Sequence, residues 1–68
     1  LMQGVVDVSD LVRCDVVEFF DGVGNNFFHR ILEIGFDEGG WFAVTRGDNN
    51  LGNDVKIRSS QILGVLVV

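Results

Sequence analysis

The chain has little that could stabilise it covalently, because Cys14 is the only cysteine among its 68 residues and proline is absent. A single thiol excludes an intramolecular disulfide. A chain this short buries only about 60% of the surface it exposes when unfolded, so its core is marginal. We expect Cys14 to be a small buried side chain, which is more common for a free cysteine than a reactive role.

Basic residues are also scarce, since five Lys and Arg face ten Asp and Glu and give a formal charge of −5. The basic residues are scattered: Arg13, Arg30, Arg46, Lys56 and Arg58. Nucleic-acid affinity depends on clustered Lys and Arg, so we expect no nucleic-acid partner. A hydrophobic content of 47% excludes a disordered acidic tail.

No apolar run approaches the roughly 20 residues that span a bilayer, and no signal peptide is visible. The chain opens at Leu1 and stops inside the apolar run Ile62–Val68, so both ends have the look of cuts in a longer protein. Residues 1–68 are expected to form one domain.

Valine, isoleucine and phenylalanine segments alternate with clusters of Gly, Asn and Asp, which is typical of short strands joined by turns. No useful helical periodicity is present. We predict an all-β fold, a small coiled sheet or partly open barrel of about five to six antiparallel strands. The predicted strands are Gly4–Val8, Asp15–Phe20, Asn26–Phe36, Trp41–Arg46, Lys56–Arg58 and Leu63–Val68.

The long predicted strand Asn26–Phe36 carries the only histidine, His29. Strict alternation predicts two faces, Phe28, Arg30, Leu32 and Ile34 on one and Phe27, His29, Ile31 and Glu33 on the other. Neither face is cleanly polar, so we expect the strand to be covered on both.

Residues that could carry chemistry are few: His29, the stretch Gly47-Asp48-Asn49-Asn50, and Asp54. Spacing alone favours ordinary roles for them. A histidine among phenylalanines is more often packed than catalytic, and Gly, Asp and Asn are favoured turn residues.

Two sequence motifs, in this order along the chain, are more specific. They are Phe28 to Ile34 (FHRILEI) and Val44 to Asn50 (VTRGDNN), and Asp54 follows them. The chain resembles the signal peptidase I superfamily, closest to the branch of archaea, the endoplasmic reticulum and some Gram-positive bacteria. The flanking segments Val12–Phe19 and Gln61–Leu66 are also similar to that family, so the resemblance covers nearly the whole chain.

The resemblance implies a serine hydrolase in which His29 is the general base and Asp54 is the carboxylate that orients it. It implies a supporting role for the loop Gly47, Asp48, Asn49 and Asn50. A base within hydrogen-bond reach takes the serine proton, and a carboxylate fixes the imidazole tautomer. Histidine suits this chemistry because its ordinary pKa is near 6.5. We therefore expect an Asp54–His29 hydrogen bond of about 2.7–3.2 Å.

The chain departs from the family in lacking its Ser-Met-x-Pro box, so no nucleophile is expected within it. Ser9, Ser59 and Ser60 stand in positions that the family does not use for attack. Cys14 replaces the glycine of a Gly-Asp pair. No metal or cofactor is expected.

The resemblance thus implies part of a serine endopeptidase that cleaves extended peptides or preproteins after small residues, inactive alone. Its parent would be membrane-associated or soluble; in a typical family member, an anchor outside this chain would hold it at an extracytoplasmic face. The alternative is a non-catalytic peptide-binding β-module of the same fold. Self-cleaving repressors share the wider fold but use a lysine base, so His29 speaks against them. Self-association is expected where a strand edge is uncovered.

Overall fold

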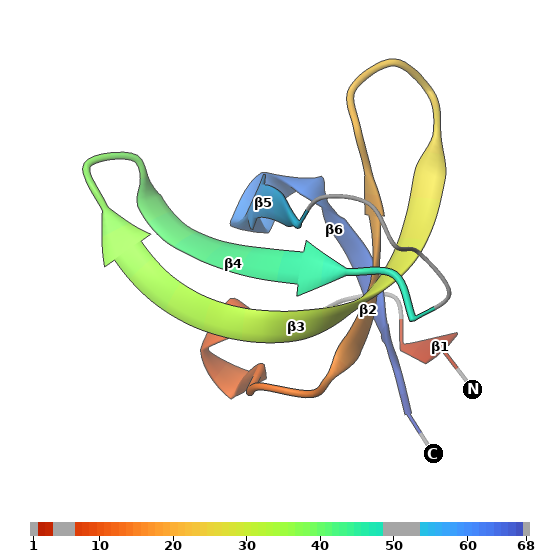
Figure 1. The fold of residues 1–68 in the computed structure, drawn as a ribbon, viewed down its shortest axis with the longest axis horizontal. Coiled ribbons are helices and arrows are strands. Elements are labelled where there is room, and N and C mark those ends of the chain that lie inside the picture. Colours follow the sequence, from red (N-terminus) through yellow and green to blue (C-terminus); the bar gives the residue numbers. More distant parts are fainter. Residues whose placement is uncertain (1, 4–6, 49–53, 68) are drawn as a thin grey trace.

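Alternating apolar residues and short polar turns fold the chain into one open sheet (Figure 1). The computed structural model describes residues 2–3, 7–48 and 54–67. Six antiparallel strands follow the order β1-β6-β2-β3-β4-β5. Their bounds are β1 Met2–Gln3, β2 Val16–Phe20, β3 Asn26–Asp37, β4 Gly40–Arg46, β5 Val55–Arg58 and β6 Ile62–Leu66. Two 3₁₀ turns, η1 (Val8–Asp10) and η2 (Ser59–Gln61), complete the described elements, and the all-β prediction is confirmed.

Aspartate side chains shape both predicted hairpins. In the β2–β3 loop, Asp21 accepts hydrogen bonds from the backbone N–H of Val23 at 2.8 Å and from the side chain of Asn25 at 2.9 Å. In the β3–β4 turn, Asp37 accepts from the N–H of Gly39 at 2.8 Å. Gly40 follows with a φ of 97°, a left-handed conformation that glycine adopts without a steric penalty.

The core lies on the inner face of the curved sheet and is apolar apart from two buried polar side chains, His29 and Thr45. Its buried apolar members are Leu11, Val17, Phe19, Ile31, Trp41, Ala43 and Ile57. Cross-strand pairs explain the grouping, since Val17 pairs with His29 and Ile31 pairs with Thr45. Directly opposed residues share a face of the sheet.

The strict alternation predicted for β3 is wrong beyond Ile31. The register with β4 shifts between Ile31 and Glu33, which marks a bulge around Leu32. An extra residue in one strand reverses the faces of all that follow. Ile34 consequently packs against the core, on the side of His29, and Glu33 is exposed.

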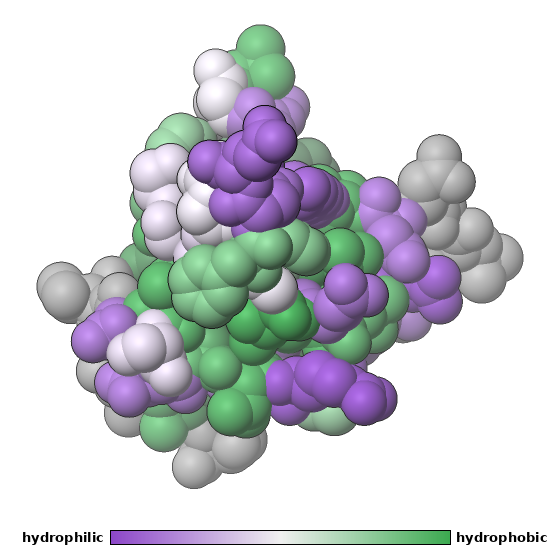
Figure 2. All heavy atoms as spheres, turned by 90° about the vertical axis from the view of Figure 1, so that its left-hand side faces the viewer, coloured by the Kyte–Doolittle hydropathy of each residue, from purple (hydrophilic) through white to green (hydrophobic). Residues whose placement is uncertain are grey.

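Coverage of β3 on both faces is also a wrong prediction. Phe28 is 54% exposed, and Phe36, at the end of the strand, is 78% exposed. The face of the molecule that carries the β3–β4 turn shows hydrophobic atoms across its middle, with hydrophilic residues around them (Figure 2). The sheet is therefore open to solvent, or to a partner, along part of β3.

The observed strand boundaries agree with the predicted ones in the two hairpins and differ from them near the two ends of the chain. Of the predicted first strand, residues 4–6 lie outside the described residues, and Val8 belongs to η1. The short β1 was not predicted at Met2–Gln3, where it pairs with β6. β6 begins at Ile62 and ends at Leu66, so it is shorter than the predicted closing strand.

Cys14 is exposed, which corrects the expectation of a buried thiol. Its φ of 78° lies in the left-handed region, where most side chains are strained. The residue sits in the turn before β2, where its N–H donates to the carbonyl of Ile31 at 2.9 Å. This position explains why glycine would suit the turn better than cysteine.

Candidate functional site

His29 occupies the inner face of β3 and is only 6% exposed. Two aromatic rings enclose it: Phe19 meets it edge-on at 5.1 Å between centroids, and Phe27 is tilted at 5.8 Å. Burial among these rings lowers the pKa of His29, because it removes water from the charged imidazolium. The imidazole is therefore neutral near pH 7, the form that a general base requires.

Thr45 on β4 provides the polar contact of the His29 ring. Its Oγ1 lies 3.0 Å from His29 Nδ1 and 3.2 Å from the carbonyl oxygen of Val55. Thr45 pairs with Ile31 on one side and with Val55 on the other. Because His29 is two residues from Ile31, the imidazole and the hydroxyl share the inner face.

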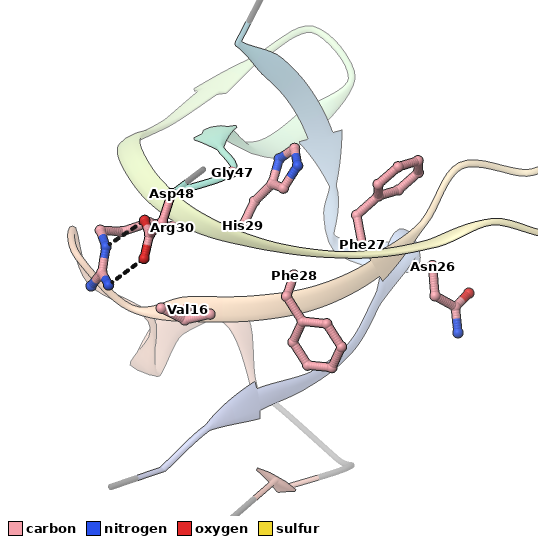
Figure 3. Close-up of a pocket in the computed structure, with 8 residues that line it drawn as sticks. All are labelled: Val16, Asn26, Phe27, Phe28, His29, Arg30, Gly47 and Asp48. Carbon is pink, nitrogen blue, oxygen red and sulfur yellow. Dashed lines mark hydrogen bonds and ion pairs between the residues drawn. The ribbon is translucent and has the colours of Figure 1, made fainter. Parts of the chain in front are cut away.

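Two hollows meet at His29, and Phe27 also lines both. The first, of about 610 Å³, follows β3 from Asn26 to Arg30 and is bounded by Val16, Gly47 and Asp48. Figure 3 shows His29 and Phe27 on one side of β3 and Phe28 on the other.

The second hollow, of about 360 Å³, is lined by Phe19, Phe27, His29 and Val55, with Asp21 and Gln61 at its polar side. Both volumes fall in the range of about 300–1,000 Å³ that is typical of ligand sites.

The first hollow follows an unpaired strand edge. Residues 26–29 of β3 pair with β2, but the pairing of β3 with β4 begins only at Arg30. Within the described ranges no strand covers the other edge of this stretch. The N–H and carbonyl of Ile31 both point toward the β2 side, where they bond to Asp15 and Cys14. Backbone groups alternate along a strand, so those of Phe28 and Asn26 face the open edge.

Asp54 does not meet His29. Its Oδ1 accepts a 2.7 Å hydrogen bond from Arg46 Nε, and the two form an ion pair. Arg46 is directly opposite Arg30, so its side chain lies on the outer face, whereas His29 points inward. The predicted Asp54–His29 hydrogen bond is therefore wrong in this structure, and the His29 ring contacts Thr45 Oγ1 instead.

Asp48 lies at the edge of the first hollow in a clamp with Arg30 (Figure 3). Arg30 Nε and Nη2 donate to the two carboxylate oxygens at 3.1 and 2.9 Å, and Nη1 donates to the Cys14 carbonyl at 2.9 Å. The Arg30 guanidinium holds the pKa of Asp48 below its usual range. The clamp joins the turn before β2 to the start of the loop after β4. Gly47 is buried, and the predicted loop residues Asn49 and Asn50 lie outside the described residues.

None of the three serines contacts His29 in the described part of the chain. Ser9 Oγ donates to Asp7 Oδ1 at 2.8 Å, and Ser59 and Ser60 form the start of η2. Among residues 2–3, 7–48 and 54–67, no group of three or more His, Cys, Asp or Glu side chains is placed to hold a metal. The same residues include no helix of the length and apolarity needed to cross a membrane.

Comparison of the chain with family models, with curated proteins and with solved structures finds no match.

The family-like motifs did not single out Thr45 as a site residue, although the alternation of residues in β4 indicates its role. Inward positions of β4 alternate as Trp41, Ala43 and Thr45, all buried. A hydroxyl at an inward position of a strand needs a buried hydrogen-bond partner. His29 on the neighbouring strand is the partner that the structure gives it.

Proposed function

We propose that the chain is the base-bearing part of a signal peptidase-like serine endopeptidase, with His29 as general base and the serine supplied from outside these 68 residues. The observation that carries the proposal is a buried imidazole whose Nδ1 contacts a hydroxyl and which lines two hollows beside a stretch of β3 that pairs on one side only. The two family-like boxes supply His29 and Thr45, each of which contributes one side of this contact.

In the proposed reaction a serine Oγ approaches the His29 ring at Nε2 and gives up its proton as it attacks a peptide carbonyl. The protonated ring then returns the proton to the leaving amine. Burial lowers the pKa of His29 and so keeps the ring ready to accept the proton at neutral pH. Arg30 and Asp48 hold the wall of the hollow in which the carbonyl would lie.

The substrate is an extended peptide that adds to the open edge of β3 at Asn26–His29. Main-chain hydrogen bonds would pair it with Phe28 and Asn26, and the two hollows beside His29 would receive alternate side chains. The preference for small residues, and the membrane association of the parent, follow from the family resemblance alone.

The second candidate is a non-catalytic peptide-binding module. The separation of Asp54 from His29 favours it, because the carboxylate that would stabilise a charged imidazole is engaged with Arg46 on the outer face. Such a module would use the same strand edge without any proton transfer.

The test is to express the parent polypeptide with the residues that precede Leu1 in its gene, and to assay cleavage of an extended peptide with small residues before the scissile bond. We expect turnover that falls by about 10²-fold or more in His29→Ala. A matched control is Glu38→Ala, in the exposed β3–β4 turn. Peptide binding without cleavage, unchanged in His29→Ala, would establish the binding module instead.

The 68-residue chain alone is expected to bind such a peptide without cleaving it. Cleavage by the pure chain that disappears in Cys14→Ala, or on substitution of one of its three serines, would overturn the proposal that the nucleophile lies outside it.

A further inference from the structure

We infer that Thr45 is a positioning residue that holds His29 in the tautomer protonated at Nδ1, leaving Nε2 as the free proton acceptor. The inference concerns the ring whose catalytic role rests on the proposed function. It assigns to a hydroxyl the task that the family resemblance gave to Asp54.

The argument starts from the single proton of the Thr45 hydroxyl. Its Oγ1 has two neighbours, the Val55 carbonyl oxygen at 3.2 Å and His29 Nδ1 at 3.0 Å. A carbonyl oxygen can only accept, so the hydroxyl proton belongs to the bond with Val55. The reverse arrangement would leave two oxygens 3.2 Å apart with no proton between them.

With its proton directed at Val55, Oγ1 presents a lone pair to His29, and Nδ1 must carry the hydrogen of that contact. A neutral imidazole has one protonated nitrogen, so Nε2 then has the free lone pair. Thr45 is fully buried, with no exposed surface, so water does not compete for the hydroxyl. No described residue donates a hydrogen bond to Nε2, and His29 borders both hollows.

The pairing of three strands makes the arrangement rigid. Thr45 lies between Ile31 of β3 and Val55 of β5, in pairs that fix the height of its hydroxyl relative to the ring. Phe19 and Phe27 also contact the imidazole, with ring centroids 5.1 and 5.8 Å from its own. A ring that is held at one nitrogen and has two aromatic neighbours keeps Nε2 in one direction, which general-base catalysis requires.

A hydroxyl differs from a carboxylate in one respect that matters for the reaction. It can fix the tautomer, but it carries no charge to stabilise the imidazolium after proton transfer. The site should therefore depend on Thr45 for orientation and be weaker in stabilising the charged ring than a histidine–aspartate pair.

Nuclear magnetic resonance tests the inference on the chain itself, because His29 is its only histidine. The ¹⁵N shifts of the ring, recorded above its pKa, distinguish the protonated from the unprotonated nitrogen. We expect Nδ1 protonated in the wild type, mixed tautomers in Thr45→Val, and recovery of the wild-type pattern in Thr45→Ser. A wild-type ring protonated at Nε2 overturns the inference without any variant, and an unchanged spectrum in folded Thr45→Val does so as well.

Activity of the longer polypeptide separates this inference from the proposed function. If the protein cleaves peptides, Thr45→Val should lower kcat by about 10²-fold or more with little change in KM, since a misplaced proton removes the base. Thr45→Ser should restore most of kcat. A wild type protonated at Nδ1 that never cleaves would overturn the endopeptidase proposal and leave the tautomer assignment standing.

Discussion

Arg46 donates a 2.7 Å hydrogen bond to Asp54, and this pair lies on the face of the sheet opposite to His29. The two residues that the resemblance joins in catalysis are thus held by different partners. Asp54 is bound by Arg46 of β4, and the His29 ring contacts the Thr45 hydroxyl.

The first prediction separates these two pairs. Asp54→Asn removes the carboxylate charge from the outer face but touches neither Thr45 nor the aromatic rings around His29. We expect the ring shifts and the titration of His29 to stay unchanged in the chain, whereas Thr45→Val changes both. A clear displacement of the His29 titration in Asp54→Asn would mean that the two side chains do interact.

The second prediction concerns pH and stability. The pKa of His29 is lowered in the folded chain by burial, so between about pH 7 and about pH 5.5 the unfolded chain binds more protons than the folded one. Stability therefore falls as pH falls through the ordinary pKa of histidine. Urea unfolding at the two pH values should show this loss, and the variant His29→Gln should show less of it.

The hairpins could be predicted from sequence because their signals are local. Asp21 and Asp37 each stand at the start of a loop, and each carboxylate accepts a hydrogen bond from a backbone N–H two residues later. Gly40 adopts the positive φ at the end of the second turn. Alternation of apolar residues then placed His29 within a β-strand. These features need no knowledge of the rest of the fold.

The site partners could not be predicted in the same way. The bulge near Leu32 shifts the register by one residue, and no local sequence pattern predicts this bulge. The partner of Asp54 depends on how β5 pairs with β4, since Thr45 opposes Val55 and leaves Arg46 beside Asp54. A sequence motif gives the residue types of a site, but the register of strand pairing determines which of their side chains are in contact.

The third prediction follows from the backbone at Cys14. Its φ of 78° costs a residue with a Cβ roughly 1–2 kcal/mol. Glycine avoids this cost, but it loses more conformational entropy on folding, which offsets part of the gain. We expect Cys14→Gly to raise the free energy of unfolding by about 0.5–1 kcal/mol. The control Cys14→Ala removes the same thiol and keeps the Cβ. Equal stability of the two variants in urea would show that the backbone is not strained there.

The fourth prediction is that the chain associates with itself through the open edge of β3. Residues Asn26–His29 include no Asp, Glu, Lys or Arg and no proline, and strand edges without such residues pair readily. Of the two strands at the ends of the sheet, β1 and β5, β5 is protected by Lys56 and Arg58, whose side chains form ion pairs with Asp37. Phe28, 54% exposed beside the open edge, would add apolar contact to a second copy.

Sedimentation velocity over a range of concentrations should show the chain moving from monomer toward dimer. Phe28→Lys places a charge beside the open edge and should weaken this association, without loss of core packing. The matched control is Phe36→Lys, which replaces an even more exposed phenylalanine at the far end of β3, where the strand is paired with β4. Equal weakening by both variants would place the association on general apolar surface, and a monomer at every concentration would show that the open edge does not pair. An extended peptide that binds at the same edge should compete with the second copy, so adding it should return the dimer to monomer.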